Sequence, residues 1–140
     1  MNRMHLSLPV ADLDASVAFY TALLGGPPDK TRPGFARFTP EHAPIALSLQ
    51  GDQAPVIDPS HHAHFGLRLD QPSDLVDAGE RLRAAGLLAA TETATTCCFA
   101  VQDKHWAVDP DGRPWELYVL LDDNVDESAA PDPTPGGCCG

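Results

Sequence analysis

The chain repeats a strand–helix plan, and this internal repeat limits the possible folds more than any single element does. Met4 to Gly26 reads as an apolar strand, a short acidic turn and an amphipathic helix that ends at glycines. Ala63 to Gly86 follows the same plan. Apolar side chains recur at helical spacing in both copies, which predicts two helices with Asp12 and Ser73 as their N-caps.

Short strands, separated by Pro and Gly, follow each predicted helix. The turn Asp109-Pro110-Asp111-Gly112 favours a tight reversal, so the last two strands are expected to form a hairpin. The sequence therefore predicts an α+β fold of two βαβββ modules packed edge to edge. We expect module one over residues 1–52, a linker over 53–61, module two over 62–121, and a flexible, acidic, Pro-rich tail over 122–140.

The charge balance argues against partners that carry many negative charges. The chain has 20 acidic and 9 basic residues, a formal net charge of −11. Without a basic stripe to release counterions from phosphates, nucleic acid and anionic membranes are not expected partners.

The N-terminus lacks a hydrophobic signal region, so a cytoplasmic protein is expected. In that compartment the 4 cysteines are expected to be reduced, metal-binding or reactive rather than disulfide-bonded.

Two histidines and one glutamate occupy notable places in the repeat. Superposing the copies aligns His5 with His64 in the first strands, and Glu116 with Ala46 in the last strands. A histidine on an apolar strand is usually a core residue, but matched placement of two favours a shared role. Glu116 lies between apolar neighbours, where an unpaired carboxylate is costly to bury. Two histidines and one carboxylate form the facial triad of non-haem Fe(II) enzymes, with positions left open.

Adjacent cysteines stand at Cys97 and Cys98. Neighbours are poor disulfide partners, whereas a vicinal dithiol suits a soft centre such as trivalent arsenic. Strand side chains alternate, so both thiols can serve one ligand only if the segment is irregular. We therefore expect a long hairpin connection over residues 93–102. Two small buried apolar residues are the alternative, and a second pair at Cys138 and Cys139 argues against it.

The paired modules, His5, His64 and the segment KHWAVDPDGRPWELYVL resemble the vicinal oxygen chelate superfamily, with its glyoxalase, bleomycin-resistance and extradiol dioxygenase relatives. TTCCFAVQDKHW and MHLSLPVADLDASVAFYTALLG are similar to the ArsI-type carbon–arsenic lyases within it. The resemblance implies a glyoxalase-like fold with a metal-containing cavity. It also implies that His5, His64 and Glu116 bind Fe(II), which another divalent metal can replace, and that Cys97 and Cys98 bind arsenic.

The activity implied by the resemblance is O2-dependent cleavage of the carbon–arsenic bond. The expected substrates are methylarsenite and trivalent aromatic arsenicals, converted to arsenite by a monomer or homodimer. Soft-metal or drug sequestration is one alternative, and another superfamily enzyme, such as a thiol transferase or glyoxalase, is a second. Strand parity alone does not decide whether Lys104 or His105 faces the cavity as a proton donor or anion clamp. Cys138 and Cys139, outside the matched core, are hypothesised to capture or hand over arsenical.

Overall fold

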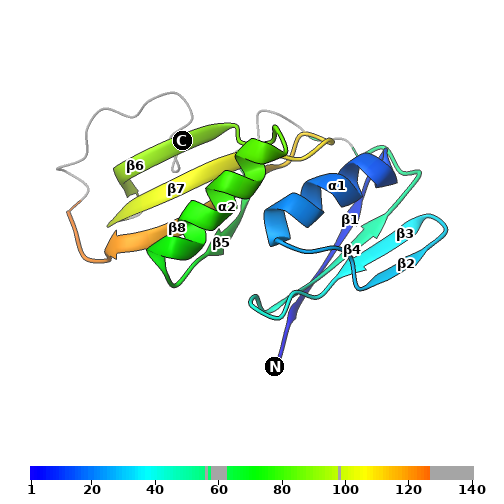
Figure 1. The fold of residues 1–140 in the computed structure, drawn as a ribbon, viewed down its shortest axis with the longest axis horizontal. Helices are drawn as coiled ribbons and strands as arrows, with labels where there is room; N and C mark the ends of the chain where they lie inside the picture. Colours follow the sequence, from blue (N-terminus) through cyan, green and yellow to red (C-terminus); the bar gives the residue numbers. More distant parts are fainter. Residues whose placement is uncertain (56, 58–62, 98, 127–140) are drawn as a thin grey trace. The chain divides into compact units, whose positions relative to one another are not determined.

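The computed structural model describes residues 1–55, 57, 63–97 and 99–126 (Figure 1). The chain forms two compact units, and the described residues give each unit one helix and one four-stranded sheet. The first unit is Met1–Asp58 with Val108–Arg113, and the second is Pro59–Ala107 with Pro114–Gly140.

The first unit is a βαβββ module whose sheet has the order β1-β4-β3-β2. Strand β1 runs parallel to β4, while β3 is antiparallel to β4 and to β2. The elements are β1 Met4–Pro9, α1 Leu13–Leu24, β2 Lys30–Arg32, β3 Phe35–Phe38 and β4 Ile45–Gln50.

Helix α1 starts and stops where its sequence predicts. The Asp12 side chain accepts a hydrogen bond from the backbone N–H of Ala15 at 3.0 Å, and thus acts as the N-cap. Gly25 ends the helix with a φ of 76°, a left-handed conformation that glycine adopts without steric cost. The apolar side of the helix is buried in the core of the unit, with Phe19 and Leu23 almost fully covered.

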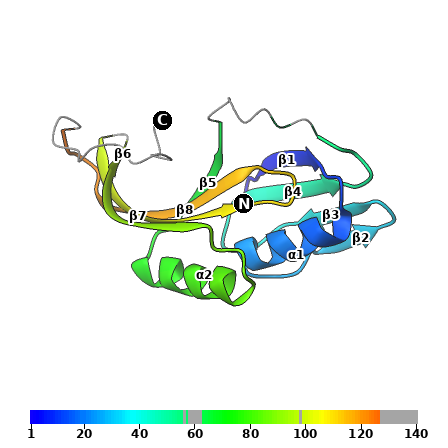
Figure 2. The same ribbon diagram turned by 90° about the horizontal axis from the view of Figure 1, so that it is seen from above.

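The second unit repeats this topology with the sheet order β5-β8-β7-β6, in which β5 is parallel to β8. The predicted α+β fold of two βαβββ modules is therefore confirmed. The elements are β5 Phe65–Arg68, α2 Pro72–Ala84, β6 Ala90–Cys97, β7 Ala100–Val108 and β8 Pro114–Asp122. Helix α2 covers one face of the sheet (Figure 2), and Leu82, Trp115 and Leu117 of this unit are buried.

The predicted N-cap of α2 is wrong. The N-cap is Gln71, which makes no side-chain capping bond, and the helix begins at Pro72 rather than after Ser73. Proline suits the first helical position because its φ is already close to the helical value and it has no N–H group that needs an acceptor.

The turn between β7 and β8 packs with the first unit, a feature that the sequence did not reveal. The Tyr20 hydroxyl donates to Asp109 Oδ2 at 2.6 Å, and Arg113 Nη1 lies 3.0 Å from the same oxygen. Arg113 Nη2 also donates to the carbonyl of Pro9 at 2.6 Å. Because these groups are buried and mutually paired, they attach the turn to the first unit.

The C-terminal segment is described only as far as residue 126, so most of the predicted flexible tail lies outside the described residues. The backbone N–H of Val125 donates to the carbonyl of Phe99 at 3.1 Å, next to the β6–β7 hairpin. Neither α1 nor α2 is long and apolar enough to cross a membrane, and the described residues contain no other helix.

Candidate functional site

Three polar side chains meet on one face of the second sheet. Glu116 comes from β8, Lys104 from β7, and His64 directly precedes β5. Glu116 Oε2 lies 3.0 Å from Lys104 Nζ, and Glu116 Oε1 lies 3.5 Å from His64 Nε2. The side chains are 1% exposed for Lys104, 12% for Glu116 and 26% for His64. Each carboxylate oxygen therefore has its own partner in a site largely shielded from water.

Gly66 provides the space that the Glu116 side chain occupies. It stands directly opposite Glu116 in the pair of parallel strands. A Cβ atom at residue 66 would lie 2.8 Å from Glu116 Cγ and 3.1 Å from its Oε1. A glycine inside a strand often marks such a close approach, and this signal in the sequence His64-Phe65-Gly66 was missed by the sequence prediction.

Aromatic rings surround the Lys104 ammonium group. Its Nζ lies 5.7 Å from the ring centroid of Trp106 and 5.7 Å from that of Tyr118, within the range of cation–π attraction. Trp106 meets His64 edge to face, with centroids 5.1 Å apart, and its indole N–H donates to Glu92 Oε2 at 2.7 Å. The rings and their hydrogen bond restrict the side-chain conformations around the carboxylate.

His105, next to Lys104 on β7, points to the opposite face of the sheet. A Cβ atom at Gly79 of α2 would overlap the His105 imidazole, so the ring packs against the helix backbone. Its Nδ1 lies 2.9 Å from the Thr91 hydroxyl. Neighbouring strand residues alternate, and Lys104 is therefore the one that shares a face with Glu116.

Burial in this position lowers the pKa of His105, with a further contribution from the nearby positive charge of Arg83. Because the folded-state pKa lies below the unfolded value of about 6.5, protonation favours the unfolded chain. We expect stability to be full above that value and to fall as pH drops through it. Melting temperatures between pH 8 and 5 check this: His105→Gln should flatten the acid loss, whereas the exposed His42→Gln control should not. Equal pH profiles for wild type and His105→Gln would contradict it.

The two modules differ in strand pairing. His5 stands opposite Ala46 in the first, whereas Gly66 stands opposite Glu116 in the second. His64 therefore precedes the direct partner of Glu116 by two residues. The predicted superposition matched His5 with His64 and also Ala46 with Glu116. The strand pairing shows that these two matches differ by two residues, so the superposition is wrong. A two-residue offset preserves the face of a strand, so His64 and Glu116 still share one face.

The predicted triad is divided between the units. The exposed side chain of His5 lies on β1 in the first unit, while His64 and Glu116 stand together in the second. Among the residues that the structure describes, no three His, Cys, Asp or Glu side chains form a group that could hold a metal ion. The set of His5, His64 and Glu116 stays a prediction.

His64 and Glu116 are nevertheless suitable as two ligands of one divalent ion. Imidazole nitrogen and carboxylate oxygen bind such ions at about 2.0–2.2 Å, so two ligand atoms of one ion lie roughly 3 Å apart. The 3.5 Å between His64 Nε2 and Glu116 Oε1 is close to this separation. The donor set, imidazole with carboxylate, also suits first-row divalent metals.

The segment that leads to the cysteines is a hairpin of two paired strands. Strand β6 continues to Cys97, which pairs with Ala100 of β7, and only two residues lie between them. The expected long connection over residues 93–102 is therefore wrong. Paired strand backbone in this stretch satisfies the hydrogen-bonding groups that a long loop would leave to solvent.

A β-bulge determines the face on which Cys97 lies. Glu92 pairs with Lys104 and Thr95 with Gln102, so β6 has one residue more than β7 in this interval. One extra residue reverses the alternation of the bulged strand. Cys97, like Glu92 before the bulge, therefore lies on the face that carries Lys104.

Ala94 is at the centre of this bulge. Its φ of 48° is left-handed, and its backbone N–H donates to Asp103 Oδ1 at 2.6 Å. This hydrogen bond compensates a conformation that is unfavourable for alanine. Without the bulge, Thr96 rather than Cys97 would lie on the face of Glu116.

Cys97 is buried and disulfide-bonded, and its partner is not among the described residues. The other three cysteines, Cys98, Cys138 and Cys139, lie outside the described residues. The expectation of a reduced thiol at Cys97 is therefore wrong for this structure. Arsenic binding by Cys97 requires reduction first, because the thiolate is the ligand.

Cys97 is separated from the Glu116 carboxylate along the sheet. Its partner Ala100 lies four residues from Lys104 on β7, a distance of about 13 Å at the usual strand rise. The far ends of β6 and β7 curl away from α2, toward the face that carries Glu116 (Figure 2).

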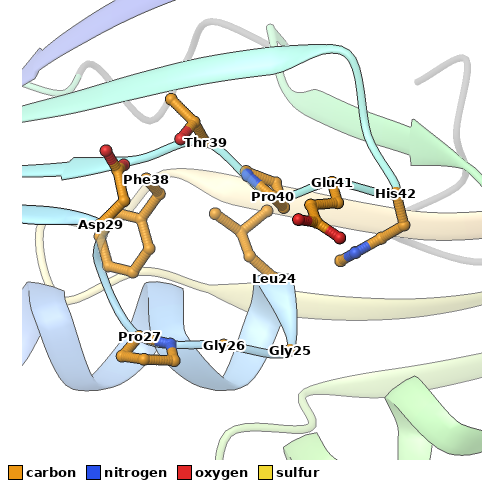
Figure 3. Close-up of a pocket in the computed structure, with 10 residues that line it drawn as sticks. All are labelled: Leu24, Gly25, Gly26, Pro27, Asp29, Phe38, Thr39, Pro40, Glu41 and His42. Atoms are coloured by element: carbon orange, nitrogen blue, oxygen red, sulfur yellow. The ribbon is translucent and has the colours of Figure 1, made fainter.

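A separate cavity of about 260 Å³ lies in the first unit, between the end of α1 and the β3–β4 connection (Figure 3). Apolar side chains of Leu24 and Phe38 form part of its wall. Asp29 also lines it, but its carboxylate accepts a hydrogen bond from Arg37 Nε at 3.1 Å. None of the predicted site residues lines this cavity.

The sequence matches the family model described as the Glyoxalase/Bleomycin resistance protein/Dioxygenase superfamily over residues 3–117. A metal ion is typical of this superfamily. A solved glyoxalase/bleomycin resistance protein/dioxygenase from Alicyclobacillus acidocaldarius superposes with a TM-score of 0.69 at 18% identity, covering 87% of this chain and 93% of that one. At this identity the likeness concerns the fold alone.

Two relatives are more similar in sequence. "Trivalent organoarsenical cleaving enzyme" from Thermomonospora curvata is 38% identical over 148 residues, covering 100% of this chain and 95% of that protein. "Cadmium-induced protein CadI" from Mycobacterium tuberculosis is 36% identical over 131 residues, covering 94% and 84%. With the family match and the paired βαβββ modules, these similarities show that the chain belongs to the glyoxalase/bleomycin resistance protein/dioxygenase superfamily.

Proposed function

We propose that this protein is a non-haem Fe(II)-dependent dioxygenase that cleaves the carbon–arsenic bond of trivalent organoarsenicals. The observation that carries the proposal is the position of Cys97 on the same sheet face as His64 and Glu116, in a chain similar over its whole length to a trivalent organoarsenical cleaving enzyme. A soft-ligand residue and two side chains of the kind that bind harder metal ions therefore lie on one face of the sheet, and this supports the proposal.

Each group has a distinct role in this proposal. His5, His64 and Glu116 hold the metal ion, and Cys97 and Cys98 hold arsenic as thiolates. Bound iron supplies a site for dioxygen. Fixing arsenic by two sulfurs orients the carbon–arsenic bond and replaces a chance encounter by a positioned one. We place the protein in the cytoplasm, where thiols are kept reduced.

The proposed cleavage of methylarsenite by O2 balances in atoms and electrons without an external reductant. Methylarsenite, CH3As(OH)2, and one O2 contain the same atoms as arsenite, As(OH)3, and formaldehyde. Arsenic stays trivalent, and the methyl carbon is oxidised as dioxygen is reduced. The separation of about 13 Å along β7 adds one requirement: the β6–β7 hairpin must bend toward Glu116 when substrate binds.

The decisive experiment is anaerobic reconstitution of reduced protein with Fe(II), followed by air and methylarsenite. We expect several equivalents of arsenite and formaldehyde per protein. Omission of iron, oxygen or thiol reductant should each prevent release. Tight arsenical binding without arsenite release, under conditions in which iron is bound, would contradict the proposal.

Sequestration of a soft metal is the second candidate, favoured by the similarity to cadmium-induced protein CadI. Cys97 would then bind a cation such as Cd(II), and protection would be stoichiometric. Release of arsenite beyond one equivalent of protein would exclude this candidate as the main activity.

A further inference from the structure

The Glu116 carboxylate is held by different groups at its two oxygens. Oε2 lies 3.0 Å from Lys104 Nζ, a hydrogen-bonding distance. Oε1 instead faces the imidazole of His64, at 3.5 Å. Oε1 therefore faces His64, the proposed ligand that lies in the same unit, whereas Oε2 is occupied by Lys104.

Lys104 has little freedom to leave this position. Its side chain is almost fully buried, and the rings of Trp106 and Tyr118 lie around its ammonium group. Moving the ammonium elsewhere in the interior would break a buried ion pair, which is strongly unfavourable. The Glu116 side chain is confined as well, because its Cγ and Oε1 fill the space left by the missing Cβ of Gly66.

We propose that Lys104 is a positioning residue that holds Glu116 Oε2 and so restricts the carboxylate to binding a metal through Oε1. The inference rests on the proposed metal site. Binding through one oxygen rather than two leaves a further coordination position for substrate or dioxygen. Lys104 also holds the carboxylate in its ligand orientation before any metal is present.

This arrangement has a cost in metal affinity. With neutral histidines, His5, His64, Glu116 and Lys104 carry no net charge, whereas the same ligands without Lys104 carry one negative charge. A buried ammonium next to a ligand carboxylate repels a divalent cation, and the repulsion is strong in a shielded site. Lys104 therefore stabilises the metal-free protein more than the metal-bound protein.

The test uses Lys104→Met, with Co(II) as a metal probe whose visible absorption reports coordination. We expect the metal-free variant to melt at a lower temperature than wild type and to recover most of the loss with Co(II). Its Co(II) affinity should rise by about tenfold or more, because the repulsion is removed. Its visible bands should weaken, because Glu116 can now bind through both oxygens and raise the coordination number.

Two controls separate positioning from simple packing. Lys104→Arg keeps a cationic donor and should retain the wild-type absorption spectrum. Arg113→Met removes a buried cation paired with Asp109, and it should lower the melting temperature equally with and without Co(II). If Lys104→Met gives no folded protein, Lys104→Gln removes the charge with a smaller change in polarity and is measured in the same way.

The outcomes distinguish this inference from the proposed function. Unchanged Co(II) affinity and spectrum in a folded, neutral Lys104 variant would overturn the positioning role and leave the metal site standing. Weaker Co(II) binding in that variant would also overturn it, since Lys104 would then support the ion. Failure of wild-type protein to bind Co(II) would overturn both the proposed metal site and the role of Lys104.

Discussion

Replacing Cys97 with serine is expected to lower arsenite release from methylarsenite by about 100-fold or more, the scale lost when a two-point attachment becomes a one-point attachment. Serine is nearly the same size as cysteine, but its hydroxyl is a hard donor that stays protonated at neutral pH. The soft arsenic then loses one of its two proposed sulfur ligands. The measurement is single-turnover arsenite release by reduced, Fe(II)-loaded protein.

Thr96→Ser is the matched control for this variant. Thr96 is the neighbour of Cys97 on β6 and, by alternation after the bulge, points to the other face of the sheet. Thr96→Ser should release arsenite as wild type does. Metal affinity should be unchanged in both variants, because Cys97 lies about 13 Å along the sheet from Lys104. Full turnover by Cys97→Ser would remove this residue from the arsenic site.

The disulfide at Cys97 makes the same prediction sensitive to redox state. Wild-type protein assayed without reductant should release as little arsenite as Cys97→Ser, and reductant should restore only the wild type. Restoration occurs because an external thiolate attacks the disulfide and frees the Cys97 sulfur.

The repeat in the sequence was sufficient to predict the fold. Apolar spacing and the Asp12 cap placed α1, and the turn residues at 109–112 placed the last hairpin. These signals are local, so they depend on neighbouring residues that the sequence shows directly. The N-cap of α2 was predicted wrongly because two neighbouring residues both signal a helix start. Ser73 suits an N-cap, but Pro72 suits the first helical position, and the helix begins at Pro72.

The details of the site depend on contacts between strands, which a single sequence does not contain. The bulge at Ala94 reverses the face of Cys97, and nothing in ATETATTC marks alanine as the left-handed residue. The partner of Lys104 follows from strand pairing and could not be assigned by parity within β7 alone. Gly66 was the one visible signal, because a glycine inside a strand suggests a close neighbour.

Replacing Glu116 with glutamine is expected to weaken divalent metal binding by more than about 100-fold, since the substitution removes the negative charge of a proposed ligand in a largely shielded site. Glutamine keeps the shape but removes the negative charge that compensates both the metal ion and buried Lys104. Arsenite release should fall below detection, while arsenical binding by reduced Cys97 persists. Binding is measured by Co(II) titration, and release by the reconstituted assay.

Glu92→Gln is the matched control for Glu116→Gln. Glu92 is a carboxylate on the same face of the sheet, on β6, and accepts a hydrogen bond from the Trp106 indole at 2.7 Å, a bond that glutamine can also accept through its carbonyl oxygen. It should bind Co(II) as wild type does. Equal Co(II) affinity of wild type and Glu116→Gln would show that Glu116 is not a ligand. Its ion pair with Lys104 would then serve stability alone, and the metal, if bound, would need other ligands.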